Sequence, residues 1–266
     1  MHDAYGRSTP YEISLPGREF ADDRFPRVES EAEERGVDLM DPGGFVLLGS
    51  TGEVLEELQV GGEDPELLHQ YGALLFHNYH FWKAGEPFYL LEAPVARFLV
   101  EGGVEAQGWT PRGPGPAGYV QLPRHLFWSH AGDDGPAEPL DGFYWTLDSG
   151  DAVSLLVVMG LRDDQPGFSV VALPPLPVAD APVWMEETAR EEGEDFSTTL
   201  PGGELDRLYS LVSTGEVLKL AARTFWYMDQ FAGGVGQPEG APEVDEGPRP
   251  STLPFRRVTL RGEEGS

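Results

Sequence analysis

The clearest periodic pattern along the chain lies within residues 64–85. Apolar and aromatic positions recur there three or four residues apart, at Leu68, Tyr71, Leu75, Tyr79 and Trp82. This is the period of a helix that buries one face. Asp64 suits the N-cap, Pro65 the first helical position and Gly85 the residue after the last turn. The pattern therefore predicts a helix over this segment.

A second helical stripe follows Ser213. Its apolar positions are Val217, Leu218, Ala221, Phe225, Met228 and Phe231. Ser213 and Glu216 have the spacing of a capping box at its start. Residues 202–212 favour a preceding helix, either separate or continuous with a kink at Gly215, and residues 181–195 favour another.

The hexapeptide Ser-Thr-Gly-Glu-Val-Leu occurs twice, beginning at Ser50 and at Ser213. The flanking residues share no pattern, so we interpret it as a local signal used twice and not as an internal repeat. Around the first copy, the β-branched and aromatic residues of 45–60 favour a hairpin with Gly52 in its turn. A capped helix from Ser50 is the alternative.

Short runs rich in aromatic and β-branched residues predict antiparallel sheet between residues 119 and 175. The runs are 119–130, 142–147, 153–161 and 167–175. The last two are expected to form a hairpin, and their near-continuous apolar character favours central positions covered by helices. Upstream, a strand is expected over 87–92, followed by a short helix or second strand over 94–102.

The two ends differ from this body in composition. Residues 1–42 hold many charges and turn formers and are expected to form a partly ordered acidic arm. Residues 233–266 are rich in Gly, Pro and Glu and suggest a flexible tail. The tail ends in a short basic and apolar segment, which is either a strand docked on the chain's own body or a peptide for a partner.

Residues 43–232 are therefore expected to form a single domain. The predicted fold class is α+β: an antiparallel sheet of about five to seven strands packed by two main helices, which follow Asp64 and Ser213.

The charge balance changes the range of partners to consider. The chain has 46 acidic and 18 basic residues, for a formal net charge of −28. The negative electrostatic potential of such a chain opposes binding to nucleic acid and to anionic membranes. Acid-rich stretches recur along the whole chain, which is typical of general solubility or salt adaptation, with a dedicated acidic face as the alternative. No apolar run is long enough for a transmembrane helix, so no membrane insertion is expected.

The amino terminus lacks the pattern of a secretory signal, which suggests a cytoplasmic protein, although a processed precursor stays open. The chain has no cysteine, which excludes disulfides and sulfur-based zinc sites. Any metal must therefore be held by histidine and carboxylate side chains.

His77 and His80 are the first candidate site. Three residues apart on the expected helix, they point to one side, a spacing that recurs in metal sites. A divalent metal would need a third ligand from elsewhere, for which His125, His130 and Asp229 are candidates. The aromatic surroundings favour instead two histidines that pack and each make a hydrogen bond.

Arg124, Trp128 and His130 are the second candidate site. On a strand these three side chains share one face and could bind an anionic or planar ligand by ion pairing and stacking. The alternative is a half-buried face whose arginine is neutralised by Asp133 or Asp134.

The sequence contains no nucleotide-binding, metalloprotease or nucleophile-elbow motif, which leaves open whether the protein is an enzyme. Two hypotheses follow. The first is an acidic non-enzymatic interaction or accessory protein that binds another protein through aromatic-rich surface patches, without a cofactor. The alternative is a small-molecule or metal-dependent enzyme with a pocket between the His77 and His80 helix and the strand of residues 124–130.

Overall fold

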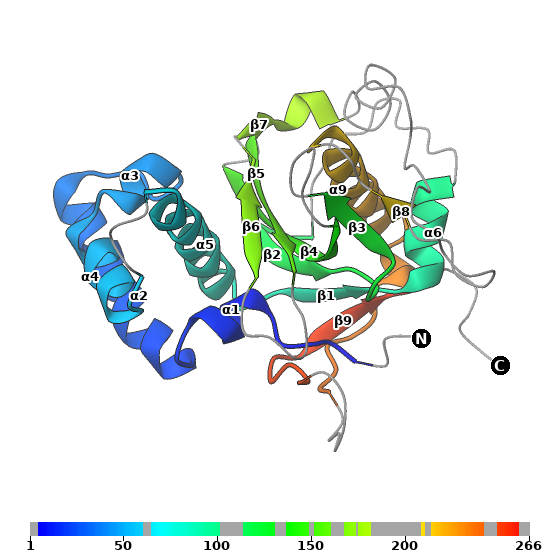
Figure 1. Ribbon diagram of the computed structural model, residues 1–266, viewed down its shortest axis with the longest axis horizontal. Helices are drawn as coiled ribbons and strands as arrows, with labels where there is room; N and C mark the ends of the chain where they lie inside the picture. The colour runs from blue at the N-terminus through cyan, green and yellow to red at the C-terminus, as the bar shows by residue number, and fades with distance from the viewer. Residues whose placement is uncertain are drawn as a thin grey trace.

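A mixed β-sheet with helices on both faces forms the centre of the molecule (Figure 1). The computed structural model describes residues 5–60, 65–101, 114–130, 137–148, 152–160, 168–173, 175–181, 209–210, 214–241 and 249–260. Within them, the α+β class is confirmed. None of the helices in these ranges is long and apolar enough to cross a membrane.

The main strands lie in the order β6 (Ser169–Ala172), β5 (Ala152–Met159), β4 (Ala137–Asp148), β2 (Ala117–Gln121), β1 (Phe88–Leu91) and β9 (Phe255–Val258). Three shorter strands attach to them: β3 (Phe127–His130) to β4, β7 (Leu176–Pro177) to β5, and β8 (Tyr209–Ser210) to β3.

The prediction of an antiparallel sheet was wrong, because the sheet is mixed. β2, β4, β5 and β6 pair antiparallel in turn, but β1 runs parallel to both β2 and β9. The physical reason is α6 (Ala93–Glu101), which follows β1 and carries the chain back so that β2 starts at the same end. The sequence left this segment undecided between helix and strand.

Alternate residues of β4 face two separate cores. Phe143 and Trp145 pack towards α6 and α9 (Thr214–Gln230), whereas Tyr144 packs towards α5 (Pro65–Lys83) on the opposite face. Figure 1 shows α6 and α9 on one side of the sheet and α2 to α5 on the other. The helix expected over residues 64–85 and the stripe after Ser213 correspond to α5 and α9.

The hairpin favoured over residues 45–60 was wrong, and the alternative, a helix that begins near Ser50, is the structure observed. Helices α3 (Pro42–Val46) and α4 (Gly49–Glu57) occupy this segment. Both helices begin at carboxylate caps: Asp41 accepts hydrogen bonds from the amides of Gly43 and Gly44, and Glu31 accepts from Gly49 and Ser50. Because Glu31 comes from another helix, the cap that decides this segment is not visible in its local sequence.

The amino-terminal segment, expected to be a partly ordered arm, forms two helices. α1 (Pro10–Ser14) packs at the end of the sheet, and α2 (Arg18–Arg35) buries Ala21, Phe25, Val28 and Ala32 against the α5 side. At the other end of the chain, β9 pairs with β1, so the segment around Phe255 is a docked strand.

Two further predictions need correction. β6 forms the predicted hairpin with β5, but it lies at the edge of the sheet and leaves Val171 exposed, so its apolar run does not mark a central strand. Tyr209 and Ser210 belong to β8 and not to a helix. The helix expected over residues 181–195 lies outside the described residues, apart from Ala181. Two short 3-10 helices, η1 (Val178–Asp180) and η2 (Ala232–Gly234), complete the described elements.

Candidate functional site

His77 and His80 both lie on the buried side of α5, but they bond in different directions. His77 Nδ1 lies 3.2 Å from the hydroxyl oxygen of Thr146 on β4. His80 Nε2 donates to the carbonyl oxygen of Leu39, 3.0 Å away, in the segment before α3. A carbonyl can only accept, so this contact assigns the proton of neutral His80 to Nε2. Each imidazole therefore makes an intramolecular hydrogen bond, one to β4 and the other to the segment before α3.

Burial determines the charge state of both rings. It lowers the pKa of His77 to about 3, and the neighbouring His80 adds to the effect. It also lowers the pKa of His80, against opposing contributions from the Leu39 carbonyl and from Asp38. Both imidazoles are therefore neutral at pH 7. Neutral imidazole can bind a metal, but no cluster of three or more potential ligands occurs in the described ranges.

The second candidate group is divided between a turn and a strand. Arg124 lies in a turn that ends at Leu126, and His125 there has a left-handed φ of 57°. β3 begins only at Phe127, so Arg124 is not part of the strand. Trp128 is half-buried; its Nε1 donates to the His125 carbonyl (3.0 Å), and its ring stacks on His125 at 5.8 Å. His130 ends β3, and its side chain is outside the described residues.

The structure does not bring the two candidate groups together. His77 contacts β4 at Thr146, whereas Trp128 pairs with Pro139, seven residues earlier on the same strand. At the rise of a β-strand, seven residues span about 23 Å. In addition, Leu126 and Phe127 pack into the core under α6 and α9, on the other face of the sheet from His77.

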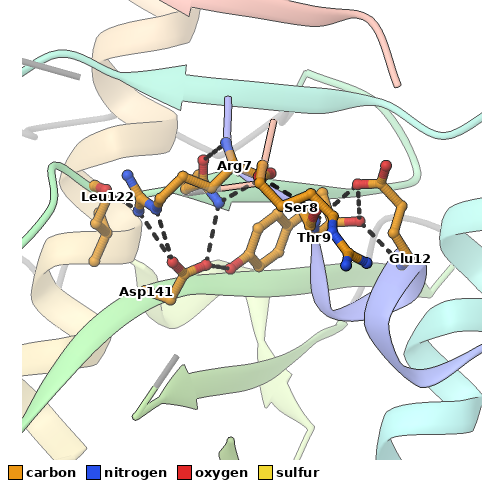
Figure 2. Close-up of polar contacts among 9 residues, drawn as sticks. Arg7, Ser8, Thr9, Glu12, Leu122 and Asp141 are labelled. Carbon is orange, nitrogen blue, oxygen red and sulfur yellow. Dashed lines mark hydrogen bonds and ion pairs between the residues drawn. The ribbon is translucent and has the colours of Figure 1, made fainter. Parts of the chain in front are cut away.

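A buried polar cluster joins the amino-terminal segment to the sheet (Figure 2). The Arg7 guanidinium donates to Asp141 Oδ1 through Nη2 (3.0 Å) and Nε (3.3 Å), and to the Leu122 carbonyl (3.0 Å). The Arg7 amide donates to Gln121 Oε1 at 2.8 Å. Asp141 Oδ2 accepts from the hydroxyl of Tyr119 and from Gln121 Nε2. These donors surround a carboxylate that is 5 % exposed.

A β-bulge aims Asp141 into this cluster. The pairing of β4 with β5 shifts register between Leu140 and Gly142, which leaves Asp141 as the extra residue. Gly142 is required at this point, because a Cβ there would lie 2.1 Å from the Val120 carbonyl oxygen. Burial and the adjacent Asp141 carboxylate raise the pKa of Tyr119 well above its usual value, so its hydroxyl keeps its proton and donates.

Glu12 makes a second connection, between α1 and the carboxy-terminal segment. Its carboxylate accepts from the amide and hydroxyl of Thr9, which caps α1. It also accepts from the Ser251 hydroxyl (2.8 Å) and from the amide (2.7 Å) and hydroxyl (2.8 Å) of Thr252. Figure 2 shows Thr9 and Glu12 beside the Arg7 cluster. Neither connection was found from the sequence, where partners more than 100 residues apart leave no local pattern.

An aromatic patch lies where α6 meets α9. Phe98 is 38 % exposed, and its ring meets Tyr227 at 6.0 Å. Phe231, half-buried, contacts Tyr227 at 4.9 Å and Trp226, also half-buried, at 5.6 Å. Tyr227 is buried and donates its hydroxyl to the Thr259 carbonyl (2.7 Å). The patch therefore consists of exposed ring surface on a fixed base.

The two helices under this aromatic patch are tied by a buried arginine. Arg223 Nη1 donates to the carbonyl oxygens of Leu99 (2.5 Å) and Val100 (3.4 Å) in the last turn of α6. A cation at the end of a helix satisfies carbonyls that lack helical partners and interacts favourably with the helix dipole. The relative position of α6 and α9, and of the rings they carry, is thereby constrained.

Carboxylates dominate the outer face of the α2 and α4 layer. Arg24, Arg27 and Arg35 of α2 each pair with a carboxylate, respectively Glu57, Asp23 and Glu31. The exposed side chains of Glu33, Glu34, Glu53 and Glu56 add further negative charge. The basic residues of this layer are therefore compensated, and its surplus charge is acidic.

The chain matches no protein-family model, and no curated protein is similar to it at a significant level.

Proposed function

We propose that the protein acts without catalysis, by binding another protein through the aromatic patch of Phe98, Trp226 and Phe231. The observation that carries this proposal is the exposed ring surface on α6 and α9, held by buried Tyr227 and Arg223. Aromatic side chains on rigid elements are typical of the centres of protein interfaces, because they bury much area at little entropic cost.

The charge of the chain supports a protein as the partner. A net charge of −28 disfavours binding to the phosphate backbone of nucleic acids. We further propose that the protein is cytoplasmic and acts without a cofactor. The buried histidines support a non-catalytic role as well, since His77 and His80 are each engaged by an intramolecular hydrogen bond.

The contribution of Phe98 to such an interface can be estimated. About 38 % of a phenylalanine surface on the order of 200 Å² is about 75 Å², worth about 2 kcal/mol if buried. Replacing Phe98 with alanine should therefore weaken binding by about 30-fold. Val171→Ala is the matched control, because Val171 is 43 % exposed at the β6 edge, far from the patch along the sheet.

The experiment has two steps. A photoreactive phenylalanine analogue at position 98, and separately at position 171, is used to crosslink the protein in its own cells, and the adducts are identified by mass spectrometry. The purified partner is then titrated against wild type, Phe98→Ala and Val171→Ala. We expect a discrete adduct from position 98 and the loss of affinity in Phe98→Ala alone. Equal adducts at both positions, or equal affinities, would refute the proposal.

A further inference from the structure

Residues 5–15, which we call the amino-terminal arm, dock on the sheet as a separate short unit. Arg7 forms an antiparallel bridge with Pro250, and the Ser8 amide donates to the Arg249 carbonyl at 3.0 Å. The Ser251 amide donates to the Gly6 carbonyl at 2.9 Å. The arm thus adds a short strand to residues 249–251, and α1 follows it.

The surface that receives the arm, which we call the arm slot, is specific for arginine. Gln121 and Asp141 are 0 % and 5 % exposed, and their amide and carboxylate point at the Arg7 backbone and guanidinium. The planar guanidinium donates to the carboxylate and to the Leu122 carbonyl at the same time. Lysine, a point charge without this fork, cannot reproduce the arrangement.

The arm and its slot are far apart in sequence, and the chain between the arm and α2 is suited to act as a hinge. Arg7 reaches Asp141, 134 residues away, and Glu12 reaches Thr252, 240 residues away. The hinge residues Pro16 and Gly17 are exposed, and Gly17 has φ 147° with no atom near its missing Cβ. Beyond the hinge, α2 is held separately, through Arg18 to Glu86 and through its apolar face.

These features make the arm transferable. A second copy presents the same slot with the same complementarity, so seating the arm there remakes every contact it leaves. The closed monomer and the exchanged dimer then differ mainly in hinge conformation and in the entropy of association. We propose that the amino-terminal arm exchanges between two copies of the chain, with Arg7 of one copy bound to Asp141 of the other.

The absence of cysteine in the chain allows a direct test. Ser8 lies opposite Arg249 in the arm strand, within the range of a disulfide between neighbouring strands. Full-length Ser8→Cys and full-length Arg249→Cys are mixed under reducing conditions, incubated at high concentration and then oxidised. When the arm of one copy occupies the slot of the other, the two thiols are held on neighbouring strands, so the mixed disulfide dimer should form in much higher yield than by collision of the folded chains. Ser30→Cys, exposed on α2, replaces Ser8→Cys in the control mixture.

A second substitution, Arg7→Lys in both copies, distinguishes exchange from collision. Reciprocal exchange replaces each contact between arm and slot by the same contact in the other copy, so the substitution should leave the final yield of mixed dimer unchanged. It should raise the rate at which this yield is reached by about tenfold, because an arm that binds its slot more weakly is released faster. Collision between exposed thiols needs no release of an arm, so its rate would not change.

We therefore expect a yield of mixed dimer well above that of the Ser30→Cys control, and a faster approach to this yield with Arg7→Lys, measured by oxidising samples at intervals after mixing. Circular dichroism of each variant checks that it is folded. Equal yields for Ser8→Cys and Ser30→Cys, or a rate of dimer formation that Arg7→Lys does not change, would overturn the proposal. This result is independent of the proposed aromatic interface, because Phe98 has no part in it.

Discussion

Acidification should destabilise the protein through His77. The folded state holds this imidazole with a pKa of about 3, because its ring is buried between α5 and β4, whereas an unfolded histidine has a pKa of about 6.5. Below pH 6.5 the unfolded chain therefore binds a proton that the folded chain does not. Stability is lost as the pH falls from 6.5 towards 3.

The size of the effect follows from the two pKa values. At pH 5, the pH is 1.5 units below the pKa of about 6.5 of the unfolded histidine, which is therefore mostly protonated, whereas the folded histidine is still neutral. This difference lowers the free energy of unfolding by about 2 kcal/mol. For a chain of this length, that lowers the melting temperature by about 4 to 8 °C. His80, whose pKa is also lowered by burial, should add to the loss in the same direction.

Urea denaturation at pH 7 and pH 5, followed by tryptophan fluorescence, measures this effect in wild type and in His77→Gln. Glutamine keeps a polar group near Thr146 but does not titrate, so the loss of stability on acidification should be about 2 kcal/mol smaller in the variant. The comparison cancels the constant cost of the substitution. His69→Gln, on the exposed face of the same helix, should behave as wild type. Equal acid sensitivity in His77→Gln and wild type would refute the reasoning.

Arg7→Ala should cost about 3 to 5 kcal/mol in urea denaturation, because Asp141 is left buried without its cation; adding Asp141→Asn should recover part of the loss. Arg24→Ala, which breaks the more exposed ion pair with Glu57, should cost no more than about 1 kcal/mol. A similarly small cost for Arg7→Ala would show that the cluster around Asp141 is solvated. Gly142→Ala should destabilise by several kcal/mol, because its Cβ would lie 2.1 Å from a carbonyl oxygen of β2. Gly52→Ala, in an open position of α4, should instead stabilise the protein by up to about 1 kcal/mol. If thermal melts show a change of stability with the same sign for both substitutions, the packing described at the bulge is contradicted.

Local sequence signals were sufficient where a segment carried its own start, stop and period. α5 was predicted from Pro65, Gly85 and a three- and four-residue apolar spacing, and α9 from the stripe after Ser213. β1 and the hairpin of β5 and β6 were predicted from runs of β-branched and aromatic residues. In these segments the partner that covers the apolar face does not change the choice of helix or strand.

Tertiary structure decided the segments whose signals come from elsewhere. Residues 45–60 are compatible with a hairpin by composition, but Glu31 of α2 caps α4 and makes the helix the better solution. The direction of β1 relative to β2 depended on α6, whose sequence suits either a helix or a strand. The edge position of β6 also could not be read from its apolar run, because strand order is set by the pairing of the whole sheet.

The functional residues divide in the same way. The sequence identified His77 and His80 as neighbours on a helix, because a three-residue spacing on a helix is a local property. It could not identify Arg7 with Asp141 or Glu12 with Thr252, because those pairs exist only after the sheet, the β-bulge and both ends of the chain have come together. Local hydrophobic periodicity therefore determined which segments become helices and strands, whereas burial and long-range pairing decided which polar groups meet.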